Sequence, residues 1–298
     1  MSGLKSFLCG LMRVTLVPLI VRELVQRRAV TILLYHDPNP RTMARHLAVL
    51  RRSYNLVSLR QFVEAHAAGT LDSLPAKSIV ITIDDGHRGN YALEPLLRDL
   101  PAQPTIFLCS GVVGTCRPFW FRTVAEPEPM KRIPDEERLA RLGQDGSEWD
   151  SADTEPQALS DEQIAELKRV VDFQSHTISH PILPYCDGAK AWMEIEESKR
   201  QLETSHGLSV FALSYPNGDY SAREMRLAKD AGYACALSVD FGFNSAKTDL
   251  YRLRRIAIDD DQDGPSALLV KASGVWGFLK RLTAEPRHGY SELPAVDT

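Results

Sequence analysis

Residues 79–86 constrain the fold of this chain more than any other stretch. Residues 79–83 are mostly apolar and β-branched, which is typical of a strand buried on both faces in a parallel sheet. Two acids, Asp84 and Asp85, follow this run directly, and Gly86 then allows a sharp turn. A buried carboxylate without a partner is costly, so this pair of acids indicates a functional site at the end of a strand. Because neighbouring residues at a strand end point in different directions, one acid can bind a cation while the other faces a reacting molecule.

A pair of histidines further along the chain completes the predicted site. His176 and His180 follow residues 170–173, another strand-like run. We expect the two imidazoles to lie on one face of a helical turn, close enough to share one metal ion. A carboxylate and two histidines would leave open positions on a divalent metal, which is typical of catalytic rather than structural sites.

Together, these two motifs resemble those of a known enzyme family. The chain reads T-I-D-D-G at residues 82–86 and H-T-I-S-H at residues 176–180. The NodB-homology polysaccharide deacetylases, or carbohydrate esterase family four, carry T-F-D-D-G and H-S/T-x-x-H in the same order. The resemblance extends over residues ~30–262, most of the chain. It implies a metal-dependent hydrolase that removes N-acetyl groups from an amino-sugar unit of a saccharide or glycolipid by attack of metal-bound water.

The resemblance also implies a role for each motif residue. Asp84 would act as general base, while Asp85, His176 and His180 would bind the metal, for which we expect Zn²⁺, with Co²⁺, Ni²⁺ or Mn²⁺ as alternatives. This division suits the chemistry, because water bound to a metal must lose a proton and a nearby carboxylate can accept it. Solvated acids at a turn and histidines of the core are the structural alternatives.

A third region, Leu-Ser-Tyr-Pro-Asn-Gly at residues 213–218, resembles the R-P-P-Y-G loop of the family in its S/A-Y-P-x-G variant branch. The resemblance implies that the backbone N–H of Asn217 binds the oxyanion, and such a donor is typically worth ~2.7–4 kcal/mol. Ser214 stands where many members carry an arginine that steadies the base, so Asp84 requires another partner. A plain turn is the alternative interpretation, because Pro-Asn-Gly favours turns. The residues predicted to contact substrate are Tyr215, Pro216 and His87.

The expected last strand departs from the family pattern. Many members end with L-x-H, whose histidine acts as general acid on the leaving amine, but residues 251–258 contain no histidine. An unfilled acid role slows C–N cleavage by ~10²–10⁴-fold. His36, in an L-Y-H motif that ends the first expected strand, is one candidate replacement, and transfer of the proton by Asp84 is another. His36 could also be purely structural. Further candidates for lining the cleft are Asp240, Asn244 and Arg255.

Strand-like and helical patterns alternate along the chain, which predicts a parallel sheet and an α/β fold. The expected strands are residues 32–35, 79–83, 105–109, 170–173, 211–215, 234–239 and 253–258. Helical patterns cover residues 41–52 and 58–68, and capping boxes at Ser160 and Ser221 open two more helices. Seven strands suit a closed or nearly closed barrel, and the resemblance implies the distorted (β/α)7 barrel of the NodB type. Active sites of such barrels lie at the C-terminal ends of the strands, and both motifs are expected there.

The sequence predicts three parts around this core. Residues 1–29 are expected to form an amphipathic segment that either closes the domain or contacts a membrane surface. Residues 30–262 form the deacetylase domain, with an insertion at about 123–156 that is either a solvated loop or a lid. Residues 263–298 are expected to form a C-terminal helix and a flexible tail.

Composition limits the remaining function classes. The formal net charge of −4 argues against a dedicated nucleic-acid binder. The 5 cysteines are scattered and favour a reducing compartment. The uncharged runs near the N-terminus are shorter than the ~20 residues that span a bilayer, so we expect a cytoplasmic protein that can contact the inner membrane surface, with export left open. A sugar deformylase or O-acetyl esterase and a catalytically weak carbohydrate-binding relative are the rival functions.

Overall fold

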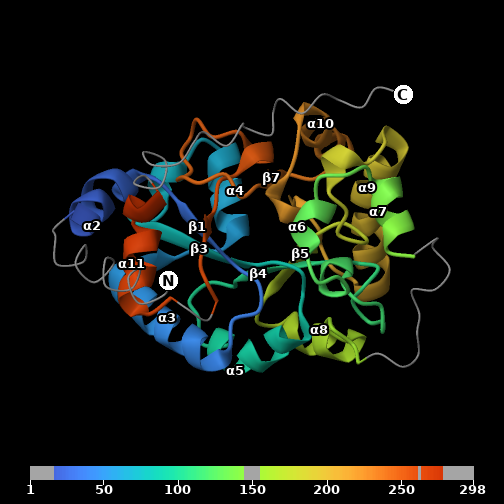
Figure 1. The fold of residues 1–298 in the computed structure, drawn as a ribbon. Helices are drawn as coiled ribbons and strands as arrows, with labels where there is room; N and C mark the ends of the chain where they lie inside the picture. Colours follow the sequence, from blue (N-terminus) through green and yellow to red (C-terminus); the bar gives the residue numbers. More distant parts are fainter. Residues whose placement is uncertain (1–16, 144–154, 261–262, 278–298) are drawn as a thin grey trace.

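A curled parallel sheet forms the centre of the molecule (Figure 1). The computed structural model describes residues 17–143, 155–260 and 263–277. The strands follow the order β7-β6-β5-β4-β3-β1-β8, and the short β2 pairs with β3 beside this path. The strands are β1 (Thr31–Tyr35), β2 (Asn55–Leu56), β3 (Ser78–Ile83), β4 (Thr105–Leu108), β5 (Asp172–Ser175), β6 (Ala212–Ser214), β7 (Cys235–Leu237) and β8 (Ile256–Ala257).

The two edges of the sheet meet at the last strand. Leu253 donates its backbone N–H to Ala236 at 3.0 Å and accepts from Ser238 at 2.9 Å, which joins it to the end of β7. A few residues later, Ile256 pairs with Leu33 of β1. The sheet therefore curls into the NodB-type α/β barrel that the sequence predicted. The seven expected strands are present, and β2 is the one that the sequence analysis missed, because two residues carry too little periodicity.

Alternation of side chains along the strands divides the apolar core in two. One set points into the barrel and the other packs against the surrounding helices, as expected for strands buried on both faces. The inner cluster consists chiefly of Ile32, Val80, Phe107, Ala212, Leu237 and Leu253, together with Leu59 and Phe62 of α4 (Leu59–Ala67). The outer cluster includes Leu33, Ile81, Ile83, Ile106, Leu108 and Phe173.

Helices surround the sheet, with α3 and α11 on one side and α9 on the other (Figure 1). Besides α4, the long helices are α3 (Pro40–Ser53), α8 (Asp161–Leu167), α9 (Gly188–His206), α10 (Ala222–Asp230) and α11 (Pro265–Ala272); the short α5 spans Glu94–Leu97. Ser58, Ser160 and Ser221 each cap a helix through a complete capping box. The helix starts predicted from these serines are confirmed.

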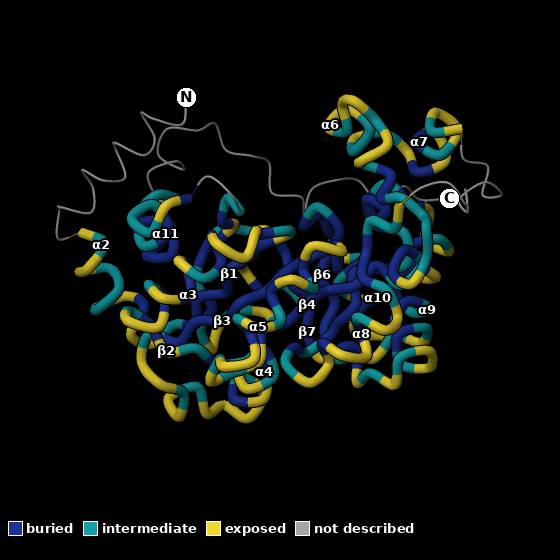
Figure 2. The backbone as a smooth tube through the Cα atoms, turned by 90° about the horizontal axis from the view of Figure 1, so that it is seen from below, coloured by how far each residue is buried: buried dark blue, intermediate teal, exposed yellow. Residues whose placement is uncertain are grey.

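The predicted insertion contains two short helices that the sequence did not indicate, α6 (Pro127–Met130) and α7 (Asp135–Arg141). They stand out from the rest of the molecule and are largely exposed (Figure 2). Residues 144–154 lie outside the described residues. On the inner side of α7, Arg138 is buried and its guanidinium lies 4.6 Å from the ring centre of Trp120. The insertion is therefore packed against the barrel at this point.

The segment before β1 is helical but irregular. It contains α2 (Val17–Ile20), a π-helical turn (Val21–Val25) and a 3-10 turn (Gln26–Arg28). The buried Gln26 amide donates to Thr31 Oγ1 at 2.8 Å and to the carbonyl of Ala272 at 2.6 Å, which fixes the end of this segment to the barrel and to α11. No helix within the described ranges is long and apolar enough to cross a membrane. Residues 1–16, in the predicted amphipathic segment, and residues 278–298, in the predicted C-terminal helix and tail, lie outside the described residues. The predicted domain bounds stay predictions.

Gln174 of β5 joins β6 to the sheet through its side chain. Only one residue pair, Ser175 and Leu213, is in register between these strands. The fully buried Gln174 amide oxygen accepts the backbone N–H groups of Phe211 at 2.7 Å and Ala212 at 2.8 Å. Next to the predicted site, the Gln174 side chain thus makes hydrogen bonds that the backbones of β5 and β6 would make in a regular ladder.

We expect Gln174→Met to destabilise the protein by about 2 kcal/mol or more, because it leaves two buried N–H groups unpaired at a cost of about 1–3 kcal/mol each. Urea unfolding followed by circular dichroism measures the change. The exposed Gln103, whose amide bonds a single carbonyl at 3.3 Å, is the matched control position. Equal stability of Gln174→Met and Gln103→Met would contradict the role assigned to Gln174.

Candidate active site

Polar residues from several strands meet at the carboxyl ends of the barrel strands. Along β3, the residues that point into the barrel alternate from Val80 to Thr82, and Asp84 continues this alternation just beyond the strand. Its backbone N–H donates to Tyr35 at 2.9 Å, so the ladder with β1 extends to this residue. Asp84 therefore faces the barrel interior, at the end of the barrel formed by the carboxyl ends of the strands, and is only 3% exposed.

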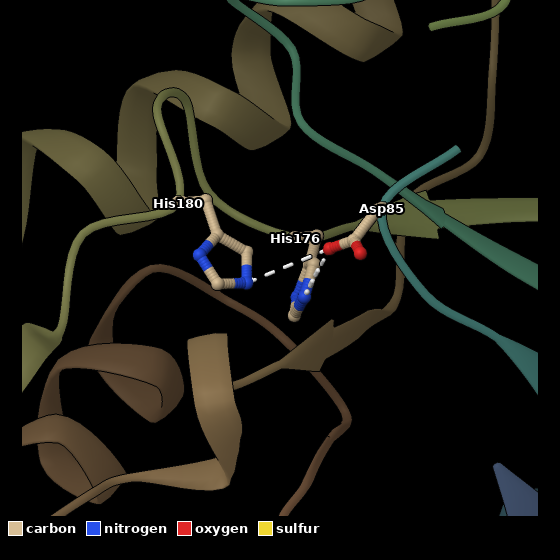
Figure 3. Close-up of side chains that lie close together, drawn as sticks. All are labelled: Asp85, His176 and His180. Carbon is tan, nitrogen blue, oxygen red and sulfur yellow. Dashed lines mark ion pairs between the residues drawn. The ribbon is translucent and has the colours of Figure 1, made fainter. Parts of the chain in front are cut away.

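Asp85, His176 and His180 form a compact group (Figure 3). Asp85 Oδ1 lies 3.3 Å from His176 Nε2 and 3.5 Å from His180 Nε2. One ligand atom from each of the three residues lies within 4.8 Å of the others, and all three are buried. The structure thus brings together the residues that the sequence motifs indicated as a metal site.

The expected helical turn between the two histidines is wrong. His176 follows β5 directly, and the chain then runs as a loop to His180. Thr177 and His180 have left-handed backbone conformations, with φ of 66° and 57°. Across the site Asp85, with φ of 73°, is left-handed as well. Such conformations are strained for residues with a Cβ and persist where the surrounding structure holds them, often at functional sites.

The atoms of this group fit a divalent cation. Asp85 Oδ1 is buried without a hydrogen-bond partner, although two imidazole nitrogens face it. His176 Nδ1 lies 2.7 Å from the carbonyl of Ser214, which can only accept, so Nδ1 carries a proton and Nε2 is the nitrogen that faces Asp85 Oδ1. Burial lowers the pKa of His180 to about 3, which keeps this imidazole neutral. A carboxylate oxygen and two imidazole nitrogens are ligands that Zn²⁺ prefers.

Both carboxylates are ionised in spite of their burial. Burial raises the pKa of Asp84, but the Arg255 guanidinium and the nearby His176 and His36 together lower it, and the net shift is downward. Burial likewise opposes ionisation of Asp85, yet the neighbouring imidazoles of His176, His87 and His180 bring its pKa well below the usual range. For His176, burial lowers the pKa and the neighbouring Asp84 and Asp85 raise it, with a net upward shift. The site therefore concentrates negative charge where a cation would bind.

Arg255 is the partner of Asp84 that the sequence analysis could not name. Its guanidinium donates to both carboxylate oxygens at 2.8 Å, and its side chain is fully buried. Ser214 Oγ donates to Asp84 at 3.0 Å, and Arg255 Nε donates to the carbonyl of Ser238 at 2.8 Å. The two departures from the family pattern are thus connected: an arginine directly before β8 contacts Asp84, and Ser214 bonds both Asp84 and this arginine.

A signal for Arg255 was present in the sequence. Leu253-Arg254-Arg255 has the spacing of L-x-H, with arginine in place of the histidine. The sequence analysis named Arg255 only as a candidate for lining the cleft, and the structure shows that it contacts the predicted base. The other two lining candidates have structural partners: Asp240 accepts from Tyr220 at 2.5 Å and Arg252 at 3.0 Å, and Asn244 donates to the carbonyl of Arg254 at 2.9 Å.

His36 lies at the mouth of the site. It follows β1, is exposed, and is close enough that its charge contributes to the lowered pKa of Asp84. Its carbonyl accepts from Asn90 at 2.9 Å, and its backbone N–H faces the Asp260 carboxylate. An exposed histidine near Asp84 suits the proton-donating role predicted for His36. That role stays a prediction.

The expected contacts of Tyr215 and Pro216 with substrate do not fit their burial. The Tyr215 side chain is fully buried, its hydroxyl donates to the carbonyl of Tyr251 at 3.0 Å, and its ring stacks on Tyr220 at 5.2 Å between centroids. Pro216 is also buried. The side chains of these two residues support the loop from the core. Asn217 follows with φ of 57° and is half-buried, so the oxyanion-binding role predicted for its backbone N–H stays a prediction.

His87 is a partner of Asp85 rather than an open surface residue. Its Nε2 lies 3.0 Å from Asp85 Oδ2, the oxygen that does not face the histidine pair. The ring packs edge-on against Phe119 at 4.8 Å between centroids, and the residue is only 3% exposed. The prediction of substrate contact does not fit this placement. His87 instead orients the Asp85 carboxylate, as outer partners of metal ligands do.

Aromatic residues border His180. Trp120 is buried and donates its Nε1–H to the carbonyl of His180 at 2.8 Å. The half-buried Phe121 lies 4.8 Å from the His180 ring and 5.3 Å from Phe119, between centroids. Trp120 is therefore core, and Phe121 is the aromatic residue that a bound molecule could reach.

Comparisons with known proteins agree with this geometry. The curated protein YxkH of Bacillus subtilis (strain 168), which carries a polysaccharide deacetylase name, is 23% identical over 203 residues, covering 67% of this chain and 59% of YxkH. The chain thus spans less than two thirds of that relative.

Solved structures share the fold at low identity. The deacetylase PplD of Streptococcus pyogenes, in complex with acetate, matches with a TM-score of 0.61, 23% identity, and coverage of 82% of this chain and 98% of PplD. IcaB from Ammonifex degensii matches with a TM-score of 0.59, 17% identity, and coverage of 83% and 98%. The polysaccharide deacetylase family model matches residues 72–236, more than half of the sequence. The chain belongs to the polysaccharide deacetylase family.

Proposed function

We propose that this protein is a metal-dependent hydrolase that removes N-acetyl groups from an amino-sugar unit of a saccharide or glycolipid. One observation carries the proposal. A buried, ionised carboxylate, Asp84, is held by Arg255 directly beside a buried Asp-His-His group whose Asp85 Oδ1 has no hydrogen-bond partner. This combination suits hydrolysis of an amide, which requires a base next to a Lewis acid.

Asp85, His176 and His180 would hold the metal, with Zn²⁺ favoured by the two imidazole ligands. When bound, such an ion lowers the pKa of water and polarises a carbonyl oxygen. Asp84 lies 3.8 Å from His176 Nε2, so its carboxylate is positioned to accept a proton beside the ligand group. The pKa of Asp84 is lowered in spite of its burial, because Arg255, His176 and His36 together favour the charged form, so the group is in the basic form at neutral pH.

The remaining roles belong to residues at the rim. The backbone N–H of Asn217 would bind the developing oxyanion, and the exposed His36 near Asp84 would protonate the leaving amine. Phe121 would pack against a sugar ring, because its ring borders His180 on the cleft side. The substrate would therefore enter between the insertion and the loop after β1.

We expect the purified protein to bind one Zn²⁺ and to release acetate from N-acetylated oligosaccharides. Asp85→Ala should weaken zinc binding by more than the ~10–100-fold typical of outer partners, because it removes a ligand. Calorimetric titration of metal-stripped protein and an acetate assay measure both effects. Asp72→Ala, at an exposed aspartate, is the control. An Asp85→Ala variant that retains both properties would refute the proposed site, and release of acetate from O-acetylated sugars alone would point to an esterase.

Removal of the Arg255 side chain should affect stability and activity differently. Arg255→Leu leaves Asp84 as a buried charge without its partner, at an expected cost of about 3–5 kcal/mol. Adding Asp84→Asn should recover much of this stability but none of the activity, because the base is then absent. Urea unfolding and the acetate assay separate the two outcomes. The exposed neighbour Arg254 provides the control variant Arg254→Leu, which should lie within about 0.5 kcal/mol of the parent.

The described part of the N-terminal segment supports a second element of the proposal, contact with an anionic membrane surface. Its large apolar side chains are exposed, with Leu24 at 74% and Val25 at 52%. Arg27 and Arg28 follow and are exposed too. Glu23 is paired with Lys77 at 3.2 Å, and Gln26 is buried, so the segment is fixed with its apolar side outward. An apolar side flanked by arginines suits a membrane interface. The cytoplasmic location stays a prediction.

We expect the protein to co-sediment with phosphatidylserine-containing vesicles and much less with phosphatidylcholine vesicles. Replacing both Leu24 and Val25 with glutamate should reduce binding by about 10-fold or more, because burial of such side chains contributes about 1.5–3 kcal/mol each. Met193→Glu, at an exposed apolar residue on α9, is the control. Unchanged binding of the double variant, or no dependence on lipid charge, would contradict this contact.

A further inference from the structure

Glu194 holds the loop that carries both histidines of the proposed metal site. It lies on α9, well outside the motif in sequence, and its side chain is fully buried. Its Oε2 accepts the backbone N–H groups of Ile178 at 2.8 Å and Ser179 at 2.9 Å, and its Oε1 accepts the Ser179 hydroxyl at 2.6 Å. A single carboxylate therefore takes three hydrogen bonds from the middle of the loop.

The backbone of the loop is shaped to receive an anion. Ile178 and Ser179 lie between the left-handed residues Thr177 and His180, and their successive N–H groups converge on one oxygen. Successive N–H groups in such turns form concavities that bind anions. The Glu194 carboxylate is this anion, and Lys190, one helical turn earlier, balances its charge at 3.0 Å.

The two ends of the loop have other anchors. His176 follows β5 and is fixed through Nδ1 on the Ser214 carbonyl at 2.7 Å. The His180 carbonyl accepts from Trp120 Nε1 at 2.8 Å. Between these points, the N–H groups of Thr177 and His180 pair locally, with Ser175 Oγ at 3.3 Å and Thr177 Oγ1 at 3.2 Å, and the carbonyls of Thr177 and Ile178 accept from Ser110 and Gly111. The N–H groups of Ile178 and Ser179 have Glu194 as their partner. Without Glu194 these two groups would be unpaired in the middle of the loop that directs both imidazoles toward Asp85.

We propose that Glu194 is a positioning residue for the divalent-cation site, setting the distance between His176 and His180 without contacting the ion. This inference rests on the proposed metal-dependent function. It assigns to α9 a role that lies outside the motif residues, because the carboxylate acts through the backbone of Ile178 and Ser179. The consequence is that metal affinity depends on a side chain that touches neither imidazole.

The test compares Glu194→Ala, Glu194→Gln and the control Glu196→Gln, at a half-buried glutamate on the same helix. Calorimetric titration with Zn²⁺ measures affinity, and the visible absorption of the Co²⁺-substituted protein reports ligand geometry. We expect Glu194→Ala to bind Zn²⁺ about 10–100-fold more weakly than the parent, with an altered Co²⁺ spectrum. Glu194→Gln keeps an acceptor for the two amides and should restore part of the affinity. Glu196→Gln should match the parent.

Parental zinc affinity and an unchanged Co²⁺ spectrum in folded Glu194→Ala would overturn the inference. If that variant does not fold, the zinc affinities of Glu194→Gln and Ser179→Ala provide the test. The inference requires both variants to bind zinc more weakly than the parent, and parental affinity in both would overturn it. A parent protein that binds no divalent metal would instead overturn the proposed function, and this inference with it. Normal zinc binding by the parent alongside unaffected Glu194 variants would overturn the positioning role alone.

Discussion

The paired hydrogen bonds between Arg255 and Asp84 are the interaction on which the rest of the site depends. Two carboxylates side by side at the end of a buried strand would repel each other and resist ionisation. The guanidinium balances one of them inside the barrel, fully shielded from solvent. Because Arg255 occupies both oxygens of Asp84, the neighbouring Asp85 is left to face the histidines, so the two acids acquire different environments within one residue of each other.

Backbone strain is concentrated around this pair. Four of the five left-handed non-glycine residues in the described part of the chain lie in the motif loops: Asp85, Thr177, His180 and Asn217. The loop that contains Thr177 and His180 is held by contacts from other elements, among them the Glu194 carboxylate and the Trp120 indole. The barrel strands are regular and can only bring residues to a common edge. The loops beyond them set the positions of the side chains to the accuracy that coordination requires.

Much of this could be predicted from local sequence patterns. The apolar runs indicated the main strands, and the two motifs indicated Asp84, Asp85, His176 and His180. The partners that fix these groups could not be predicted in the same way, because Arg255 and Glu194 contact them across the fold and carry no local periodicity. Tyr215 shows the opposite error. Its motif position suggested exposure to substrate, but the alternation of side chains after β6 turns its ring into the core.

Closure of the barrel has a consequence for how the protein is made. The segment that joins β7 to β1 near Leu253 also carries Arg255. A nascent chain that ends before this segment already contains every motif acid and imidazole, yet it lacks the counter-charge and the final hydrogen bonds between the sheet edges. The catalytic site can therefore form only after this last segment has been synthesised. A truncated or frameshifted product would contain the motifs but not a complete catalytic site.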